Sequence, residues 1–201
     1  RNINKMKLPT VKEIRKLHLK YALNKKVFLL IFTHCQIIKD ISKQLIRKNG
    51  LTIDRKLIMT GSLLHDIGAY RFIDRQGIFD EINYIRHGIE GYQILSREGF
   101  PKELCLIAER HTGVGISKDD VVKQGLNLPA RNYLPVTVEE KIIMYADKFH
   151  SKSSRFNSFS AYALYVKRFG QDKVKRFQSL AQVFGIPNLK PLAEKYSQTI
   201  V

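Results

Sequence analysis

Cysteine is scarce in this sequence of 201 residues, and it has no long hydrophobic run. Two cysteines, Cys35 and Cys105, are too few for a disulfide scaffold or a cysteine-rich zinc module, and they suit a reducing compartment. The longest apolar run, from Val27 to Phe32, has six residues, whereas a membrane span needs about 20. We also find no secretory signal. These absences predict a cytoplasmic protein without a membrane span.

The composition is that of a folded globular protein. Hydrophobic residues make up 44% and charged residues 26% of the chain, which argues against disorder. A chain of this length forms one domain of ordinary size and can bury roughly 70% of its unfolded surface. The sequence therefore predicts a single core that needs no disulfides.

Acidic residues are too few to balance the basic ones. The chain has 35 basic and 18 acidic residues, a net charge of +17. The excess lies at the two ends, with +8 in residues 1–26, +1 in residues 27–140 and +8 in residues 141–201. Such a field attracts polyanions such as nucleotides, nucleic acid or anionic lipid. A solvated lysine-rich surface explains the same numbers.

Helix signals recur along the chain, and no segment alternates with the period of a strand. Thr10 with Glu13 and Thr137 with Glu140 have the spacing of a capping box, and Gly50 is a plausible helix stop. We therefore predict an all-α protein, with element ends uncertain by a few residues. Helices are expected over residues 10–22, 26–48, 54–67, 87–98, 101–112, 137–149, 158–169, 171–184 and from about residue 191.

Two segments lack helical patterns. Residues 113–135 are rich in Gly, Pro, Asn and Asp and predict a loop, and residues 150–157 predict a mobile, basic surface loop. Further on, Tyr162, Tyr165 and Phe169 recur at helical spacing, which favours core packing over stacking on a nucleotide base.

Four histidines and two aspartates occupy helix ends or apolar helix faces, where their side chains point toward the core. Each alone has an ordinary explanation, such as a satisfied core histidine or an aspartate paired with a lysine. His18 and His150 lack the apolar context and are expected to be ordinary surface residues. The remaining set is His34, His65, Asp66, His87, His111 and Asp147.

Together these six residues indicate a metal site. A buried aspartate without a partner costs several kcal/mol, and a cation removes that cost. Neutral imidazole and carboxylate together suit divalent zinc, manganese or iron. Four imidazoles and two carboxylates are too many ligands for one tetrahedral ion, so they favour two metals that share a carboxylate.

The order of these residues resembles the HD superfamily of metal-dependent phosphohydrolases. The stretch from Leu64 to Gly68 is similar to its His-Asp-Ile-Gly motif. Residues 86–91, 109–113 and 145–148 resemble an uncharacterised branch of HD proteins and the bacterial hydrolases that split diadenosine tetraphosphate symmetrically. The Gly-Tyr-Pro segment of cyclic-di-GMP phosphodiesterases and the Glu-Asp pair of alarmone hydrolases are absent. The resemblance covers about residues 26–150.

This resemblance implies a helical bundle with a basic addition at each end. Residues 1–25 would form a basic N-terminal helical extension, and residues 26–150 the HD domain with its metal site. Residues 151–201 would form basic C-terminal helices packed on the same domain.

The resemblance also implies the ligand set. One metal would be held by His34, His65, Asp66 and Asp147, and Asp66 would bridge to a second metal held by His87 and His111. Two divalent ions are expected, with iron or manganese preferred and magnesium, nickel, cobalt or zinc also compatible.

The implied activity is hydrolysis of a phosphoester or phosphoanhydride bond of a nucleotide or dinucleoside polyphosphate by a metal-bound hydroxide. Asp66 or Asp147 would accept the proton of the water. Arg110 and Lys148 flank the ligands and would act in catalysis and hold phosphates, while a surface ion pair is the other explanation for Arg110. Lys152 and Arg155 would contact further phosphates, unless they belong to a solvated face.

Two other functions fit the same residues. One is a one-metal nucleoside monophosphate phosphatase, which would use only the first group of ligands. The other is a basic nucleic-acid-binding protein whose HD site is idle. The expected partner is a nucleotide or another phosphorylated small molecule, nucleic acid can bind through the basic ends, and the oligomeric state stays open.

Overall fold

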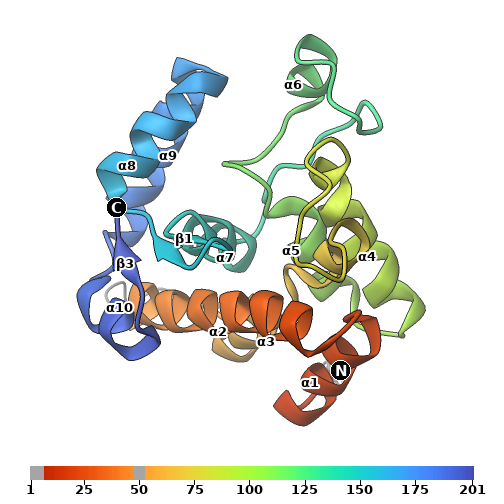
Figure 1. Ribbon diagram of the computed structural model, residues 1–201. Helices are drawn as coiled ribbons and strands as arrows, with labels where there is room; N and C mark the ends of the chain where they lie inside the picture. The colour runs from red at the N-terminus through yellow and green to blue at the C-terminus, as the bar shows by residue number, and fades with distance from the viewer. Residues whose placement is uncertain (1–6, 48–52) are drawn as a thin grey trace, which may run out of the picture.

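The computed structural model describes residues 7–47 and 53–201, which form a bundle of helices with a small three-stranded sheet (Figure 1). None of the helices so described is both long and apolar enough to cross a membrane. The α-helices are α1 (Val11–Tyr21), α2 (Lys25–Arg47), α3 (Arg55–Leu64), α4 (His87–Arg97), α5 (Lys102–Arg110), α6 (Lys118–Lys123), α7 (Val138–Asp147), α8 (Phe159–Val166), α9 (Gln171–Phe184) and α10 (Lys190–Tyr196). The shorter elements are the 3-10 helices η1 (Ile67–Phe72), η2 (Tyr84–Arg86) and η3 (Lys167–Phe169) and the strands β1 (His150–Ser151), β2 (Arg155–Phe156) and β3 (Thr199–Ile200).

The predicted all-α fold is confirmed. Each predicted helix has a counterpart whose ends differ by a few residues. Two of them end early and continue as 3-10 helices: the segment 54–67 as α3 and then η1, and the segment 158–169 as α8 and then η3. Gly50, expected to stop the second helix, lies outside the described residues.

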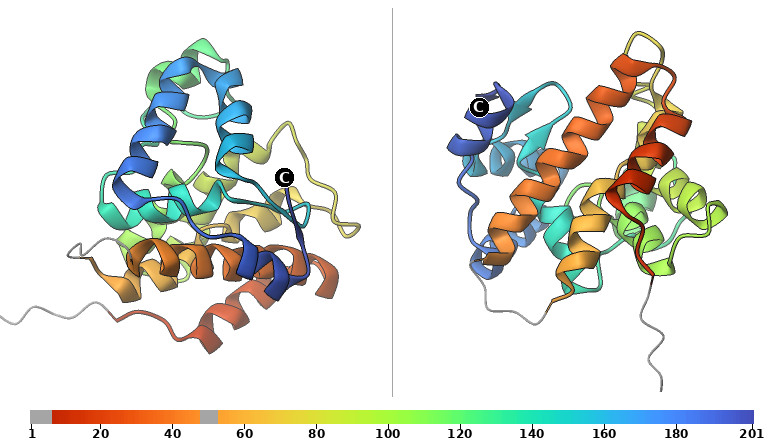
Figure 2. Two further views of the ribbon diagram at one scale, coloured as in Figure 1. Left: turned by 90° about the vertical axis from the view of Figure 1, so that its left-hand side faces the viewer. Right: turned by 90° about the horizontal axis from the view of Figure 1, so that it is seen from below.

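Helix α2 is the central element of the bundle. It packs against α3 and α7 and crosses the molecule diagonally in the right-hand view of Figure 2. Ile31, Ile38 and Ile41 are fully buried along its inner face. Burying a side chain of this size contributes about 1.5–3 kcal/mol, so this stripe holds α2 firmly in the core. His34 lies within the same stretch and therefore faces the interior.

The two predicted capping boxes differ in the structure. At the start of α1, the Thr10 hydroxyl accepts from the backbone of Glu13, and the Glu13 carboxylate accepts from the backbone of Thr10. At the start of α7, the Thr137 hydroxyl accepts from the Glu140 backbone, but the Glu140 carboxylate accepts from Val136 instead. The second box is therefore only half formed.

Two loop predictions are wrong in part. Residues 113–135 include α6, whose capping box joins Ser117 and Asp120. Residues 150–157 form a hairpin in which β1 pairs antiparallel with β2, and β3 from the C-terminus pairs parallel with β2. Strands of two residues are too short to show alternation, which is why the sequence pattern missed them. The hairpin is anchored because His150 and Phe156 are buried.

Gly68, at the start of η1, allows two backbones to approach closely. A Cβ atom at this position would overlap the carbonyl oxygen of His87 and the backbone nitrogen of Gly91. Glycine is therefore required where η1 meets the first turn of α4. This contact brings His87 beside Asp66, which immediately precedes η1.

Replacing Gly68 with alanine should push η1 away from α4 and lower the free energy of unfolding by about 3 kcal/mol or more. Denaturant titration of the two proteins measures this change. Gly91→Ala is the matched control, because its Cβ would lie 3.1 Å from the Cβ of Ala108 and clash less severely. Equal stabilities of the two variants would contradict the close approach at Gly68.

Candidate metal centre

The six histidine and aspartate residues singled out from the sequence lie together inside the bundle. They come from the middle of α2, from the C-terminal ends of α3, α5 and α7, and from the first residue of α4. Asp147 has the most exposed side chain of the set, at 14%, and the other five residues are buried. In chain order they are His34, His65, Asp66, His87, His111 and Asp147.

One group of donor atoms forms around His34 and His65. Their Nε2 atoms are 3.3 Å apart. Asp147 Oδ1 lies 3.0 Å from Nε2 of His34 and 3.5 Å from Nε2 of His65. Asp66 Oδ2 lies 3.4 Å from Nε2 of His34. Of these donors, the atoms of His34, His65 and Asp147 lie close enough to one another to hold a metal ion.

A second group forms on the other side of Asp66. The Nε2 atoms of His87 and His111 are 2.9 Å apart, and both face Asp66 Oδ1, at 3.6 Å and 3.5 Å. The two carboxylate oxygens of Asp66 thus face different groups of donors. The donor atoms of Asp66, His65 and His111 also lie close enough together to hold a metal ion.

The far side of each imidazole explains its orientation. In His65, His87 and His111, Nδ1 donates to the carbonyl oxygen of the residue three positions earlier, at 2.6–2.8 Å. Because a carbonyl only accepts, Nδ1 carries the proton and Nε2 keeps its lone pair. Backbone hydrogen bonds of this kind are typical of histidines that bind metal.

The donor set fits divalent cations. The Nε2 atoms of His87 and His111 face each other with no proton between them, which is unfavourable unless a positive charge lies nearby. Both oxygens of Asp66 are buried without a hydrogen-bond partner, although Lys152 Nζ lies 2.5 Å from Oδ2. A buried carboxylate requires a positive charge, which the Lys152 ammonium supplies at Oδ2 and which divalent cations would supply at both oxygens.

The pKa values of three of the four histidines agree with metal binding. For His65, burial lowers the pKa, but Cys35, Asp147 and Asp66 outweigh burial and hold that pKa well above its ordinary value. Burial lowers the pKa of His34 and His111, and burial and the neighbouring His111 lower the pKa of His87 to about 3. These imidazoles are therefore neutral at pH 7, as metal ligands must be. Burial alone would raise the pKa of Asp66, but Lys152 and the surrounding histidines hold it well below its usual value.

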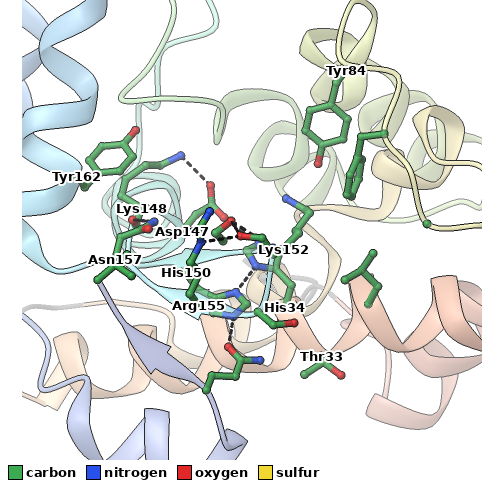
Figure 3. A pocket seen from close by; sticks show the side chains of 18 of the residues that line it. Thr33, His34, Tyr84, Asp147, Lys148, His150, Lys152, Arg155, Asn157 and Tyr162 are labelled. Atoms are coloured by element: carbon green, nitrogen blue, oxygen red, sulfur yellow. Dashed lines mark hydrogen bonds and ion pairs between the residues drawn. The ribbon is translucent and has the colours of Figure 1, made fainter.

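Both lysines predicted from the sequence, Lys148 and Lys152, contact aspartates of the centre (Figure 3). Lys148 Nζ donates to Asp147 Oδ2 at 2.7 Å and to the carbonyl oxygen of His111 at 3.1 Å, so it ties the two together. Lys152 extends from the hairpin to Asp66 and lies 5.5 Å from the ring centre of Tyr84. Both amino groups place positive charge beside the carboxylates.

The two predicted arginines lie farther out. Arg110 NH1 contacts the buried Glu140 carboxylate at 3.2 Å, and Arg110 is not among the residues that line the large cavity beside the centre. Arg155 lines that cavity, is exposed, and donates from Nε to Ser153 Oγ at 3.1 Å. The structure thus brings Lys148 and Lys152 to the centre, places Arg155 at the rim, and joins Arg110 to α7.

The prediction that His18 and His150 are surface residues is wrong. His18 is fully buried, donating from Nε2 to the carbonyl of Leu63 at 2.8 Å while Tyr70 Oη lies 2.9 Å from its Nδ1. Burial lowers the pKa of His18 to about 4. It therefore supports the end of α3, directly before His65. No local pattern in the sequence marks this role.

His150 is also buried, and it contacts a candidate ligand. Its Nδ1 lies 2.8 Å from Nδ1 of His34, and its Nε2 lies 2.8 Å from Oε1 of Gln198. Because Nε2 of His34 faces the centre, its Nδ1 carries the proton and donates to Nδ1 of His150. Nε2 of His150 then donates to Oε1 of Gln198. Sequence reasoning missed both residues, because neither stands in the HD motif and Gln198 comes from the C-terminal end.

Comparisons with known proteins agree with this site. The family model for the HD domain matches residues 31–152. An uncharacterized protein of Methanocaldococcus jannaschii is 35% identical over 145 residues, which cover 71% of this chain and 79% of that protein. A tRNA (cytidine(56)-2′-O)-methyltransferase of Thermoplasma volcanium is 31% identical over 150 residues, and one of Picrophilus torridus is 34% identical over 128 residues. The matches cover 75% and 64% of this chain but 40% and 33% of the two methyltransferases.

Solved structures show the same fold. The HD domain of the L. monocytogenes phosphodiesterase PgpH aligns with a TM-score of 0.54 at 16% identity, covering 91% of this chain and 98% of that one. Its complex with cyclic-di-AMP aligns with a TM-score of 0.52 at 15% identity, covering 83% and 93%.

The chain belongs to the HD domain family. Its helical bundle carries clustered histidines and aspartates that could hold a metal ion. These comparisons do not confirm the narrower resemblance to hydrolases of diadenosine tetraphosphate.

Gln198→Ala should weaken metal binding about 10-fold, because His34 would lose the support that reaches it through His150. Competition between the protein and a chelating dye for manganese or zinc measures the dissociation constant. Gln198→Glu is the control, since a carboxylate still accepts the proton of His150 and should preserve the affinity. Unchanged affinity in Gln198→Ala would show that His34 needs no such support.

Proposed function

We propose that this chain hydrolyses a phosphoester or phosphoanhydride bond of a nucleotide or dinucleoside polyphosphate, using two divalent ions that Asp66 and the surrounding histidines would help to hold. One observation carries the proposal: the two buried oxygens of Asp66 face two separate groups of histidines. A one-metal phosphatase has no use for His87 and His111 in that position. The dinuclear form is therefore favoured over that alternative.

The proposed ligand sets follow the two groups. His34, His65, Asp66 and Asp147 would hold one ion, and Asp66, His87 and His111 the other. Divalent ions at such a site lower the pKa of a water molecule toward neutrality and neutralise charge on phosphoryl oxygens. We favour iron or manganese, because sites of mixed imidazole and carboxylate suit them, with magnesium, nickel, cobalt or zinc also compatible.

The side chains around the ligands supply the remaining functions. Lys148 fixes the orientation of Asp147 through its hydrogen bond to Oδ2. Asp147 is the most exposed carboxylate of the centre and is proposed to accept the proton of the attacking water. Lys152 can turn from Asp66 toward a phosphoryl oxygen and stabilise its negative charge. We assign Arg155 to phosphates at the rim, and Arg110 to holding α5 against Glu140 of α7.

The surroundings of the centre support an anionic substrate. A cavity of about 1290 Å³ beside the centre is lined by Lys26, Lys148, Lys152 and Arg155, and the chain carries a net charge of +17. The structurally similar PgpH domain binds cyclic-di-AMP in its crystal.

We propose that the HD domain spans residues 26–150 with basic additions over 1–25 and 151–201. The buried, unpaired Cys35 and Cys105 suit the cytoplasm.

Nucleic-acid binding is the second candidate. The relatives named as tRNA methyltransferases and the basic ends of the chain favour RNA as a ligand or substrate. If the centre had no catalytic role, the protein would cleave no phosphoester. His65→Ala would then leave both the affinity for RNA and its salt dependence unchanged. If RNA is the substrate, the same variant abolishes its cleavage.

The proposal predicts two equivalents of metal per chain. His111→Ala should lose about one equivalent, because only the His87 group depends on it, while Asp66→Ala should lose both. Elemental analysis of anaerobically purified protein measures the metal. A phosphate-release screen of nucleotides, dinucleoside polyphosphates and cyclic dinucleotides on the same samples measures activity. One equivalent in the wild-type protein, unaffected by His111→Ala, would indicate the one-metal phosphatase.

Lys152→Met should lower kcat/KM at least 100-fold while both metals stay bound, because a positive charge next to the phosphoryl group is lost. Lys175→Met is the control, since it removes the same charge from an exposed position of α9. Equal loss of activity in both variants would mean that net charge alone matters. Loss of metal in Lys152→Met would instead assign the lysine to the integrity of the centre.

A further inference from the structure

Two cavities with different walls meet at the metal centre. The larger one, the basic chamber, has a volume of about 1290 Å³ and is lined by His34. The smaller one, the apolar chamber, has a volume of about 400 Å³ and is lined by His87. Tyr84, Asp147 and Lys152 line both. His34 of the first group thus opens into the basic chamber and His87 of the second group into the apolar chamber, while Asp147 of the first group opens into both.

The basic chamber has one wall of cations and hydroxyl groups, and Leu29, Leu30 and Phe79 line another part of it. The first wall is the hairpin, with Lys152, Arg155 and the serines at 151, 153 and 154, and Lys26 lines the chamber from α2. Figure 3 shows Arg155 and Lys152 extending from the hairpin near His34. Hydroxyl groups and cations of this kind suit phosphate oxygens.

The apolar chamber has two hydrophobic walls. One wall is formed by Ile116 and Leu126, which belong to a small hydrophobic cluster separate from the main core. Tyr165 and Phe169 form the other, with ring centres 5.6 Å apart. The two walls come from the α6 side and the α8 side of the molecule, which stand apart in Figure 1.

The aromatic wall is exposed instead of packed in the core. Tyr165 is 48% exposed and Phe169 is 44% exposed, while Tyr162 on the same helix is buried at 9%. The sequence-based expectation of core packing therefore holds for Tyr162 but is wrong for the other two. An isolated exposed aromatic residue is ordinary, but two adjacent ones that line a chamber beside a catalytic centre form a stacking surface.

We propose that the apolar chamber binds the aromatic base of the substrate and that the basic chamber binds its phosphate-rich arm. This inference rests on the proposed function and narrows it. The cleaved phosphorus would lie beside Asp147, which lines both chambers. The base would lie on the side of His87, and the anionic arm on the side of His34.

A nucleoside attached to a chain of phosphates, or the phosphorylated end of an oligonucleotide, fits this arrangement. Its base would contact Tyr165 and Phe169, and its phosphates would contact Lys26 and Arg155.

Binding of AMP, ribose 5-phosphate and ATP to the metal-loaded full chain tests the base-binding chamber. AMP should bind at least about 10-fold more tightly than ribose 5-phosphate, because the base stacks in the apolar chamber. Phe169→Ala and Tyr165→Ala should each remove most of this preference without changing the affinity for ribose 5-phosphate. Leu164→Ala is the matched control, since Leu164 is 73% exposed on α8 and lines neither chamber.

Arg155→Ser tests the basic chamber. It should reduce the gain in affinity from AMP to ATP and leave AMP binding unchanged. Equal binding of AMP and ribose 5-phosphate, or a preference that survives Phe169→Ala and Tyr165→Ala, would overturn the base-binding chamber.

Failure of this inference and failure of the proposed function give different results. Preference for AMP without any phosphate release leaves the chamber intact and refutes the hydrolase. Phosphate release without preference for AMP leaves the hydrolase intact and refutes the chamber.

Discussion

The buried carboxylate of Asp66 is the constraint on which the centre depends. It has no exposed surface and lies among four imidazoles, so its charge is stable only beside cations. The surrounding fold keeps this arrangement in place. His65 and His111 follow the C-terminal ends of α3 and α5, which place them beside Asp66. The close approach at Gly68 places His87 beside the same carboxylate. The stability of the bundle and the affinity for metal are therefore linked.

The C-terminal part of the chain belongs to the site as much as the HD domain does. The family match ends at residue 152, yet Gln198 supports His34 through His150, and β3 pairs with the hairpin that carries Lys152. Helix α8 and η3 supply the aromatic wall of the apolar chamber. The basic C-terminal segment thus completes the centre and shapes the space around it.

The helices and the six clustered residues were predictable, because helix caps and apolar stripes are local signals and the HD motif has a fixed order. The support around the ligands was not. His150 and Gln198 meet only after β3 joins the hairpin, and strands of two residues leave no pattern. The sequence suggests that Arg110 binds phosphate. In the structure the Glu140 carboxylate does not complete the capping box with Thr137 and instead forms an ion pair with Arg110. These contacts join residues that are far apart in the sequence, so the spacing of residues along the chain does not predict them.

The central claim is that Asp66 is shared by two cations. Anomalous scattering from crystals of the manganese-loaded protein tests it most directly, since it locates each metal without reference to activity. Two anomalous peaks, one on each side of the Asp66 carboxylate, are the expected result. A single peak confined to the His34 group, or none beside Asp66, would contradict it.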